Sequence, residues 1–277
     1  MMTENSVSPE SIIRDYPRLT LEDSFSFQCH QSLECFTRCC NDVTIVLTPY
    51  DVIRMKQALH MDSSEFLEKY TLSPFSKDQK IPVVILKMDP ETKDCSFVSK
   101  ENGCSIYANR PWACRMYPLG MAEPDNPTPS DRSFHFLLRD DMCLGHGADR
   151  EIKVSEWISE QGIEEYDVYG ASFKDLMLHP FWNENDSLTP AQIDMYYMAC
   201  YDLDRFRRFV FQTRFFQLFD VDEDRIEAMR KNDLELSDFA MQWLRFSLFH
   251  EKSMKIKPSA VESMRGNVEK TGQSKNG

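Results

Sequence analysis

The sequence predicts an α-rich α+β fold, in which a compact cysteine-bearing part with a few short strands precedes a helical C-terminal part. Three observations indicate this fold class. Several apolar stretches begin at a hydroxyl cap followed by Pro, which is typical of helix starts. Residues 81–88 are rich in β-branched side chains, which favours a strand. Aromatic residues recur at helical spacing after residue 189, which indicates the core face of a helix.

The first half of the chain predicts short elements. Ser8-Pro9 and Thr48-Pro49 each place a hydroxyl before a Pro at the first helical position. Asp62-Ser63-Ser64-Glu65 has the spacing of a capping box and predicts another helix start. The other expected elements of this half are strands over 81–88 and 134–138 and a Pro-rich loop over 121–129.

The second half predicts mainly helices. The longest is expected from Thr189-Pro190 to about residue 218, with Gln192 at the capping-box position. Its aromatic stripe is interpreted as packed core rather than as a cofactor groove. The other expected helices cover 153–161, 173–178 and 235–249.

Composition divides the chain into four predicted segments. The first is an N-terminal helical lead-in, the second a cysteine-cluster metal-binding domain, the third a helical part packed on it, and the last a polar, disordered tail. Their expected bounds are 1–24, 25–148, 149–250 and 251–277.

The charge and the apolar content exclude several classes of partner. The chain has 277 residues, and its 32 Lys and Arg against 45 Asp and Glu give a net charge of −13, which disfavours nucleic acid. No stretch approaches the roughly 20 apolar residues of a membrane span, and the start lacks a secretory signal pattern. We therefore expect a cytoplasmic protein, and no particular protein partner is indicated.

The nine cysteines are the most informative feature. In a reducing compartment, grouped thiols are more often metal ligands or redox groups than disulfides. Cys200 is isolated among apolar residues and is predicted to be core. The other eight fall in two groups and are the candidate metal ligands: Cys29, Cys35, Cys39 and Cys40 in the first, and Cys95, Cys104, Cys114 and Cys143 in the second.

Thiolate chemistry limits which metals these cysteines could bind. Four converging thiolates suit tetrahedral zinc or an iron–sulfur cluster and hardly suit magnesium or calcium. Because an adjacent pair seldom sends both sulfurs to one ion, Cys39 or Cys40 is expected to ligate elsewhere. His146, or His30 in place of Cys29, is an alternative ligand. The competing interpretation is that the thiols are separate buried hydrophobes.

Two arginines and a tyrosine near Cys114 are candidate cofactor-binding residues. Arg110, Arg115 and Tyr117 could offset the charge of a thiolate cluster or hold an anionic substrate. The alternative is that the arginines pair with nearby carboxylates and that the tyrosine packs. Cys114 between two arginines could also be a nucleophile, since nearby cations lower a thiol pKa.

These residues resemble a known family. The Cys-rich segment followed by Leu47-Thr48-Pro49-Tyr50-Asp51, and the later Arg110-Pro111 with Cys114-Arg115, are similar to the YkgJ-type CxxCxxCC proteins, described as zinc- or iron-chelating. The resemblance covers about residues 25–148. Five residues separate Cys29 from Cys35, which is wider than the family's usual first spacing. The positions that carry over are Cys35, Cys39, Cys40, Cys95, Cys104, Cys114 and Cys143.

The resemblance implies a bound metal, either zinc or an iron–sulfur centre. One branch of the family is similar to the flagellin lysine N-methylases, which are linked to an iron–sulfur cluster. Three functions therefore stay open: a metal-binding protein of uncharacterised role, an iron–sulfur-dependent methyl-transfer or redox enzyme, and an interaction module with a purely structural zinc.

Overall fold

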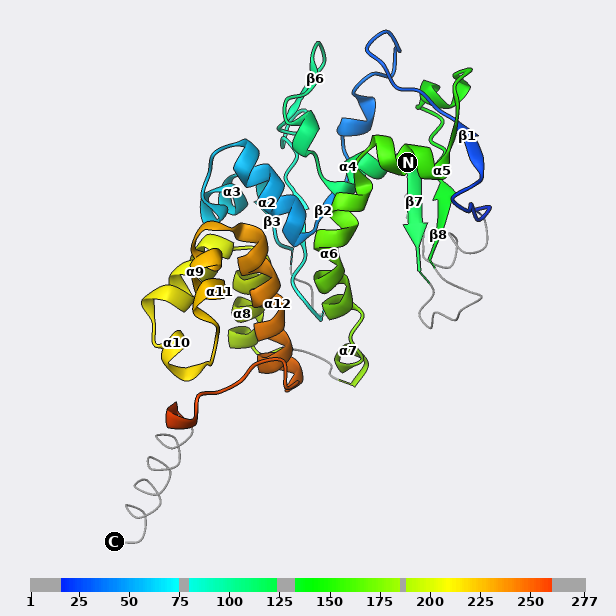
Figure 1. Cartoon of the computed structure of the whole chain (residues 1–277). Helices are drawn as coiled ribbons and strands as arrows, with labels where there is room; N and C mark the ends of the chain where they lie inside the picture. The colour runs from blue at the N-terminus through cyan, green and yellow to red at the C-terminus, as the bar shows by residue number, and fades with distance from the viewer. Residues whose placement is uncertain (1–15, 75–79, 124–132, 185–187, 261–277) are drawn as a thin grey trace, which may run out of the picture. The chain divides into compact units, whose positions relative to one another are not determined.

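The computed structural model describes residues 16–74, 80–123, 133–184 and 188–260 (Figure 1). The chain forms two compact units, and each unit is built from two separate stretches of chain. We call Met1–Ile45 with Leu86–Val168 the cysteine unit, and Val46–Ile85 with Tyr169–Gly277 the helical unit. The expected helix start at Ser8-Pro9 lies outside the described residues.

The cysteine unit contains three short antiparallel pairs of strands. β1 (Ser24–Ser26) pairs with β9 (Glu151–Lys153), which places Phe25 opposite Ile152. β5 (Val98–Ser99) pairs with β6 (Gly103–Cys104). β7 (Leu119–Ala122) pairs with β8 (Phe134–Leu137). The strand expected over 134–138 is therefore confirmed, whereas Met121 and Ala122 of the expected loop belong to β7.

One apolar core holds this unit together. Its members come from β1, β7, β9 and the helices near them, so that elements far apart in the sequence share one buried cluster. Trp157 also donates from Nε1 to the Met116 carbonyl at 3.2 Å, which satisfies its indole N–H in the core. The buried members are Phe25, Phe27, Met116, Leu119, Ile152, Val154, Trp157 and Ile163.

The helices of the cysteine unit are short. The cysteines at 39 and 40 lie in η1, and η3 directly follows Cys143. α5 confirms the helix expected over 153–161, and α6, which begins in this unit, is longer than the 173–178 expected. The elements are η1 (Arg38–Cys40), η2 (Tyr107–Asn109), α4 (Trp112–Met116), η3 (Leu144–Gly147), α5 (Val154–Glu160) and α6 (Ile163–Met177).

The helical unit begins with a small sheet and two capped helices. Its strand order is β2-β4-β3, with β2 antiparallel to β4, which confirms a strand within 81–88. Thr48 caps α2 as predicted: the Asp51 N–H donates to its hydroxyl at 3.1 Å. Asp62 caps α3 by accepting from the Ser64 N–H at 2.8 Å. The bounds are β2 (Val46–Leu47), α2 (Pro49–Ala58), α3 (Ser63–Tyr70), β3 (Thr71–Leu72) and β4 (Val84–Leu86).

The prediction of one long helix over 189–218 is wrong, because three helices occupy that stretch. Asp202, which is buried, stops the first one: it accepts from the Arg205 N–H at 3.3 Å and from the Ser63 hydroxyl at 2.7 Å, and so caps a new helix. Thr213 then leaves the helical conformation, and its hydroxyl accepts from the Phe215 N–H. The three are α8 (Pro190–Cys200), α9 (Leu203–Gln212) and α10 (Phe215–Leu218).

The remaining helices complete this unit, in which α12 contacts α8, α9 and α11 (Figure 1). The aromatic stripe is core, as predicted: Tyr196 and Phe206 are fully buried, and Cys200 is buried among them. Of the predicted tail, residues 251–260 are described, and there the Asp220 N–H donates to the Lys255 carbonyl at 2.8 Å. The remaining helices are α7 (Phe181–Glu184), α11 (Glu223–Lys231) and α12 (Asp233–Phe249).

None of the helices in the described ranges is long and apolar enough to cross a membrane. The predicted α-rich α+β class is confirmed, because the short strands of the first half are followed by helices.

Candidate metal centre

All nine cysteines lie in described residues, and all are free thiols. The eight predicted metal ligands belong to the cysteine unit, whereas Cys200 belongs to the helical unit. Their environments differ. Cys35 is buried, Cys29 and Cys39 are exposed, and the other five are half-buried.

Backbone hydrogen bonds bring the first cysteine segment beside the loop that carries Cys143. The Gln28 N–H donates to the Gly145 carbonyl at 3.1 Å, and the Leu144 N–H donates to Cys35 Sγ at 3.3 Å. Gly145 permits this approach, because a Cβ there would lie 2.8 Å from Cε2 of Phe27. Cys35 and Cys143 are thus held in adjoining loops although 108 positions separate them in the sequence.

A second set of hydrogen bonds ties Cys40 and Asn41 to the residues just before β5. The Cys95 N–H donates to the Cys40 carbonyl at 2.8 Å. The next residue, Asn41, donates from its side chain to Asp94 at 2.7 Å. In the β5–β6 hairpin, Cys104 lies opposite Val98. Cys95, the first residue of the second cysteine group, is therefore hydrogen-bonded to the last residue of η1.

Backbone N–H groups also hydrogen bond to the sulfurs of Cys95, before β5, and of Cys104, in β6. Burial raises the pKa of Cys95 and of Cys104. Hydrogen bonds from the Phe97 and Ile106 N–H groups, each two residues further on, act in the opposite direction. Together with Leu144 at Cys35, three thiols accept a backbone N–H. Such bonds stabilise the thiolate, which is the form that binds a metal.

The adjacent pair in η1 shares a proton. The Cys40 thiol donates to Cys39, and this bond lowers the pKa of Cys39 to about 7 against the opposing effect of burial. The same bond, together with burial, raises the pKa of Cys40. Although Cys29 is an exposed residue, partial burial of its thiol, then repulsion from Cys39, Cys35 and Cys143, raises its pKa to about 11. Several thiols therefore lie close enough to influence one another's ionisation.

Arg110 is the buried charge of this region. Its side chain donates to Gln161 Oε1, and its guanidinium carbon lies 3.7 Å from the Tyr107 ring centroid. The residue is 8% exposed, and its Nε and Nη1 are buried without a hydrogen-bond partner among the described residues. Its positive charge lowers the pKa values of Cys29, Cys39 and Cys104.

Arg115 and Tyr117, the other two predicted cofactor-binding residues, have internal partners. Arg115 donates to the carbonyls of Gln161 at 2.6 Å and of Arg110 at 3.3 Å, and also to that of Ala108. Burial and a hydrogen bond from its hydroxyl to Cys143 raise the pKa of Tyr117. Arg115 therefore braces the backbone around Arg110, while Tyr117 contacts a candidate ligand.

His146 is partly buried in η3, three residues after Cys143. Both ring nitrogens are buried and lack a hydrogen bond of good geometry within the described residues. Burial and Arg139 lower its pKa, while the nearby Leu138 carbonyl and Asp140 oppose that shift. A neutral imidazole is the form that can bind a metal. His30, in contrast, is exposed.

Sequence reasoning did not find the backbone donors or Gln161. The N–H groups of Phe97, Ile106 and Leu144 carry no side-chain signal, and Gln161 lies 51 positions from the arginine that it binds. The one sequence feature shared by two of these donors is that an apolar residue, Phe97 or Ile106, stands two positions after Cys95 or Cys104.

The thiols are neighbours but are not in coordination geometry. Within the described ranges, no group of three or more His, Cys, Asp or Glu side chains is arranged to hold a metal ion. The fit to a metal is therefore chemical: soft donors gathered in one unit, N–H groups on three sulfurs, and unpartnered guanidinium nitrogens beside them.

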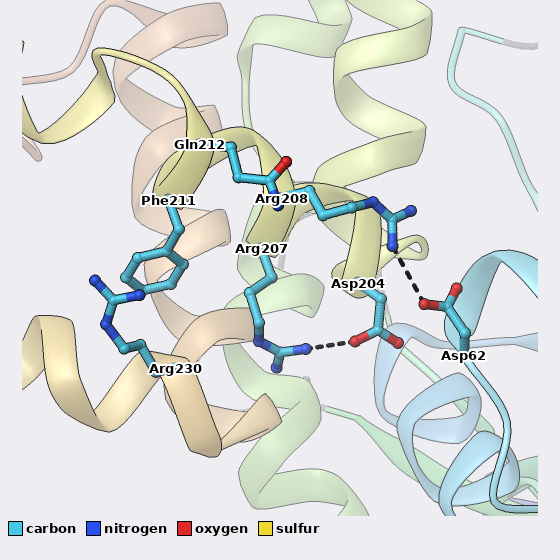
Figure 2. A pocket seen from close by; sticks show the side chains of 7 residues that line it. All are labelled: Asp62, Asp204, Arg207, Arg208, Phe211, Gln212 and Arg230. Carbon is cyan, nitrogen blue, oxygen red and sulfur yellow. Dashed lines mark hydrogen bonds and ion pairs between the residues drawn. The ribbon is translucent and has the colours of Figure 1, made fainter.

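The helical unit offers a different kind of cavity, of about 330 Å³ (Figure 2). Its guanidinium groups are paired: Arg207 with Asp204, Arg208 with Asp62 at 3.3 Å, and Arg230 with Glu227 at 2.9 Å. These pairs neutralise the charge of the cavity, so it is a weaker candidate site than the cysteine unit. The lining residues are Asp62, Asp204, Arg207, Arg208, Phe211, Gln212 and Arg230.

Comparison with known proteins gives one match. Residues 28–144 match the model of the CxxCxxCC family, described as "Putative zinc- or iron-chelating domain". This range contains all eight candidate ligands. The matched family is the one that the cysteine pattern resembles. No curated protein and no solved structure matches the chain.

Proposed function

We propose that residues 28–144, which match the model of the CxxCxxCC family, bind zinc or an iron–sulfur centre through thiolates. The residues that would hold it are the eight cysteines of the cysteine unit. Cys35, Cys95 and Cys104 are the best supported, because each already accepts a backbone N–H.

These N–H···S bonds are the single observation that carries the proposal. A buried thiol that is only a small hydrophobe needs no donor aimed at its sulfur. A thiolate ligand does, because the donor offsets part of its negative charge and fixes the direction of the sulfur. Three such donors in one unit therefore favour ligation over simple burial.

Arg110 supports the same interpretation. A zinc ion with four thiolates retains two negative charges, and a buried anionic centre needs a compensating charge nearby. Arg110 has two N–H-bearing nitrogens without a partner in the described structure and acts on three thiols. When bound, zinc would cross-link the loops, whereas an iron–sulfur cluster would add one-electron chemistry.

We further propose that the protein works in a reducing compartment such as the cytoplasm. Eight free thiols in one unit would be oxidised elsewhere, and their oxidation would remove the ligands.

The test is metal analysis of the full chain purified without oxygen. We expect bound zinc, or bound iron and sulfide with absorbance near about 400 nm. Cys95→Ser should lower the metal content because serine does not supply a soft donor. Cys200→Ala is the matched control: this thiol is buried in the helical unit, so metal content should not change. A chain that binds neither metal after reconstitution would contradict the proposal.

A further inference from the structure

We infer that the helical unit binds a soluble organic phosphate ester, with its phosphate held by Arg208 and Arg230 and its apolar part in an adjoining cavity. All residues of this site belong to the helical unit, so the inference does not depend on the proposed metal centre. The observation that carries it is a pair of neighbouring cavities. One is lined by arginines, the other has a largely apolar surface, and both are lined by Arg208 and Gln212.

Arg207 holds the arginine-lined cavity in place (Figure 2). It pairs with Asp204 and with Asp233. Its Nε also donates to the Met229 carbonyl at 3.5 Å. Because Met229 directly precedes Arg230, this bond ties α9 to the turn of α11 that carries Arg230. All three nitrogens of Arg207 are thus engaged, so its role is to position the two helices.

The other two arginines are held by ion pairs that a ligand can replace. Arg208 lies 3.3 Å from Asp62, and Arg230 lies 2.9 Å from Glu227. The four side chains are between 43% and 64% exposed. Exposed ion pairs contribute little to stability, so a phosphate can take the place of either carboxylate at low cost. Asp62 would still cap α3, because it also accepts from the Ser64 N–H at 2.8 Å.

Arg230 is already arranged for bidentate binding. Its guanidinium carbon lies 4.1 Å from the centroid of the Phe211 ring, which covers one face of the group. Glu227 binds its Nε, and in the described part of the chain no acceptor binds its two Nη groups. The planar fork of a guanidinium matches two phosphate oxygens. Arg230 therefore has N–H groups free to bind a phosphate.

The second cavity explains why the ligand is an ester rather than free phosphate. Its volume is about 680 Å³, which is in the range of small-molecule sites. Met195 of α8, Phe209 of α9 and Trp243 of α12 line it, and the two rings pack with centroids 5.3 Å apart. Free phosphate would leave this apolar surface in water, whereas an ester with an apolar body covers it.

The experiment is calorimetric titration of the full chain with inorganic phosphate, hexyl phosphate and hexanol. We expect hexyl phosphate to bind at least about tenfold more tightly than inorganic phosphate, because two buried methylene groups already correspond to that gain. Hexanol should bind more weakly than hexyl phosphate, because it offers no charge to the arginines. Equal affinity for these two ligands would overturn the inference.

Variants locate the site. Arg208→Gln and Arg230→Gln should each weaken hexyl phosphate binding by at least about tenfold, because each removes a hydrogen bond between charged groups. Arg214→Gln is the matched control: this arginine is exposed and lines neither cavity, so affinity should not change. Met195→Gln should weaken hexyl phosphate binding and leave inorganic phosphate binding unchanged.

Urea unfolding of each variant verifies that it is folded. The two arginines are tested separately, so one variant still decides the question if the other fails to fold. Losses no larger than that of Arg214→Gln would overturn the inference. Sedimentation of the chain with vesicles that contain phosphatidic acid, without binding of soluble hexyl phosphate, would assign the surface to a membrane and would also overturn it.

Discussion

At the scale of single residues, close contacts decide which side chains the fold accepts. Gly120 in β7 lies against the buried ring of Phe136, and a Cβ there would be 2.3 Å from Cζ of that ring. Gly145 has the same role beside Phe27, next to the candidate ligand loops. The sequence shows that glycine is scarce, but it does not show which glycines are required.

We expect Gly120→Ala to destabilise the protein by about 1–3 kcal/mol, because the added methyl overpacks a buried aromatic ring. The measurement is the free energy of unfolding in urea. Gly170→Ala is the matched control: it lies in α6 with nothing within 4 Å of an added Cβ, so it should stabilise by about 0.5–1 kcal/mol. Equal effects of the two substitutions would contradict the packing argument.

At the scale of elements, buried charge pairs join the helices of the helical unit. Lys56 of α2, which is 6% exposed, contacts Asp204 of α9 at 2.8 Å and Asp233 of α12 at 3.0 Å. Arg207 pairs with the same two carboxylates. Burial opposes ionisation of both, but it is outweighed. Hydrogen bonds from Lys56 and the Ser63 N–H lower the pKa of Asp204, and hydrogen bonds from Arg207 and Lys56, together with their charges, lower the pKa of Asp233.

The sign of these pKa shifts predicts an acid-sensitive protein. Because each folded-state pKa lies below the unfolded value of about 3.9, the stabilisation is complete above that value and is lost as pH falls through the lowered pKa values. We therefore expect the free energy of unfolding to decrease below about pH 4, measured in urea across pH. Asp233→Asn should remove part of that pH dependence.

The same variant should cost about 3 kcal/mol near neutral pH, because it leaves buried cations short of a partner. Asp194→Asn is the matched control. Asp194 pairs with Arg205 at 2.7 Å, but both side chains are exposed, so less than about 1 kcal/mol should be lost. A loss at Asp233 no larger than that at Asp194 would show that the buried network does not stabilise the fold.

At the scale of the whole molecule, the two units should respond differently to metal removal. The candidate ligands all belong to the cysteine unit, and a thiolate centre contributes folding free energy where its ligands lie. Hydrogen exchange of the full chain, with and without a zinc chelator, should show faster exchange over 86–168 on removal and little change in α8, α9 and α12. Equal acceleration in both units would contradict this expectation.

The sequence predicts local elements well where one short signal decides them. Thr48 before Pro49 marks the start of α2, and the hydroxyl forms the expected cap. The signal fails at Asp202, because the stretch around it also suits a continuous helix. The hydroxyls of Ser63 and Ser64, about 140 positions away in the sequence, donate to that carboxylate and hold it where it caps α9. A local pattern carries no record of such distant partners.

The same limit applies to the candidate site. By itself, the sequence determined that eight thiols are grouped, that soft-metal chemistry suits them, and which family their spacing fits, because residue type and spacing fix all three. Tertiary structure alone decided which loops adjoin, which sulfurs accept backbone N–H groups, and that Arg110 is buried beside thiols from both groups. These depend on contacts between segments far apart in the chain, which only the folded backbone brings together.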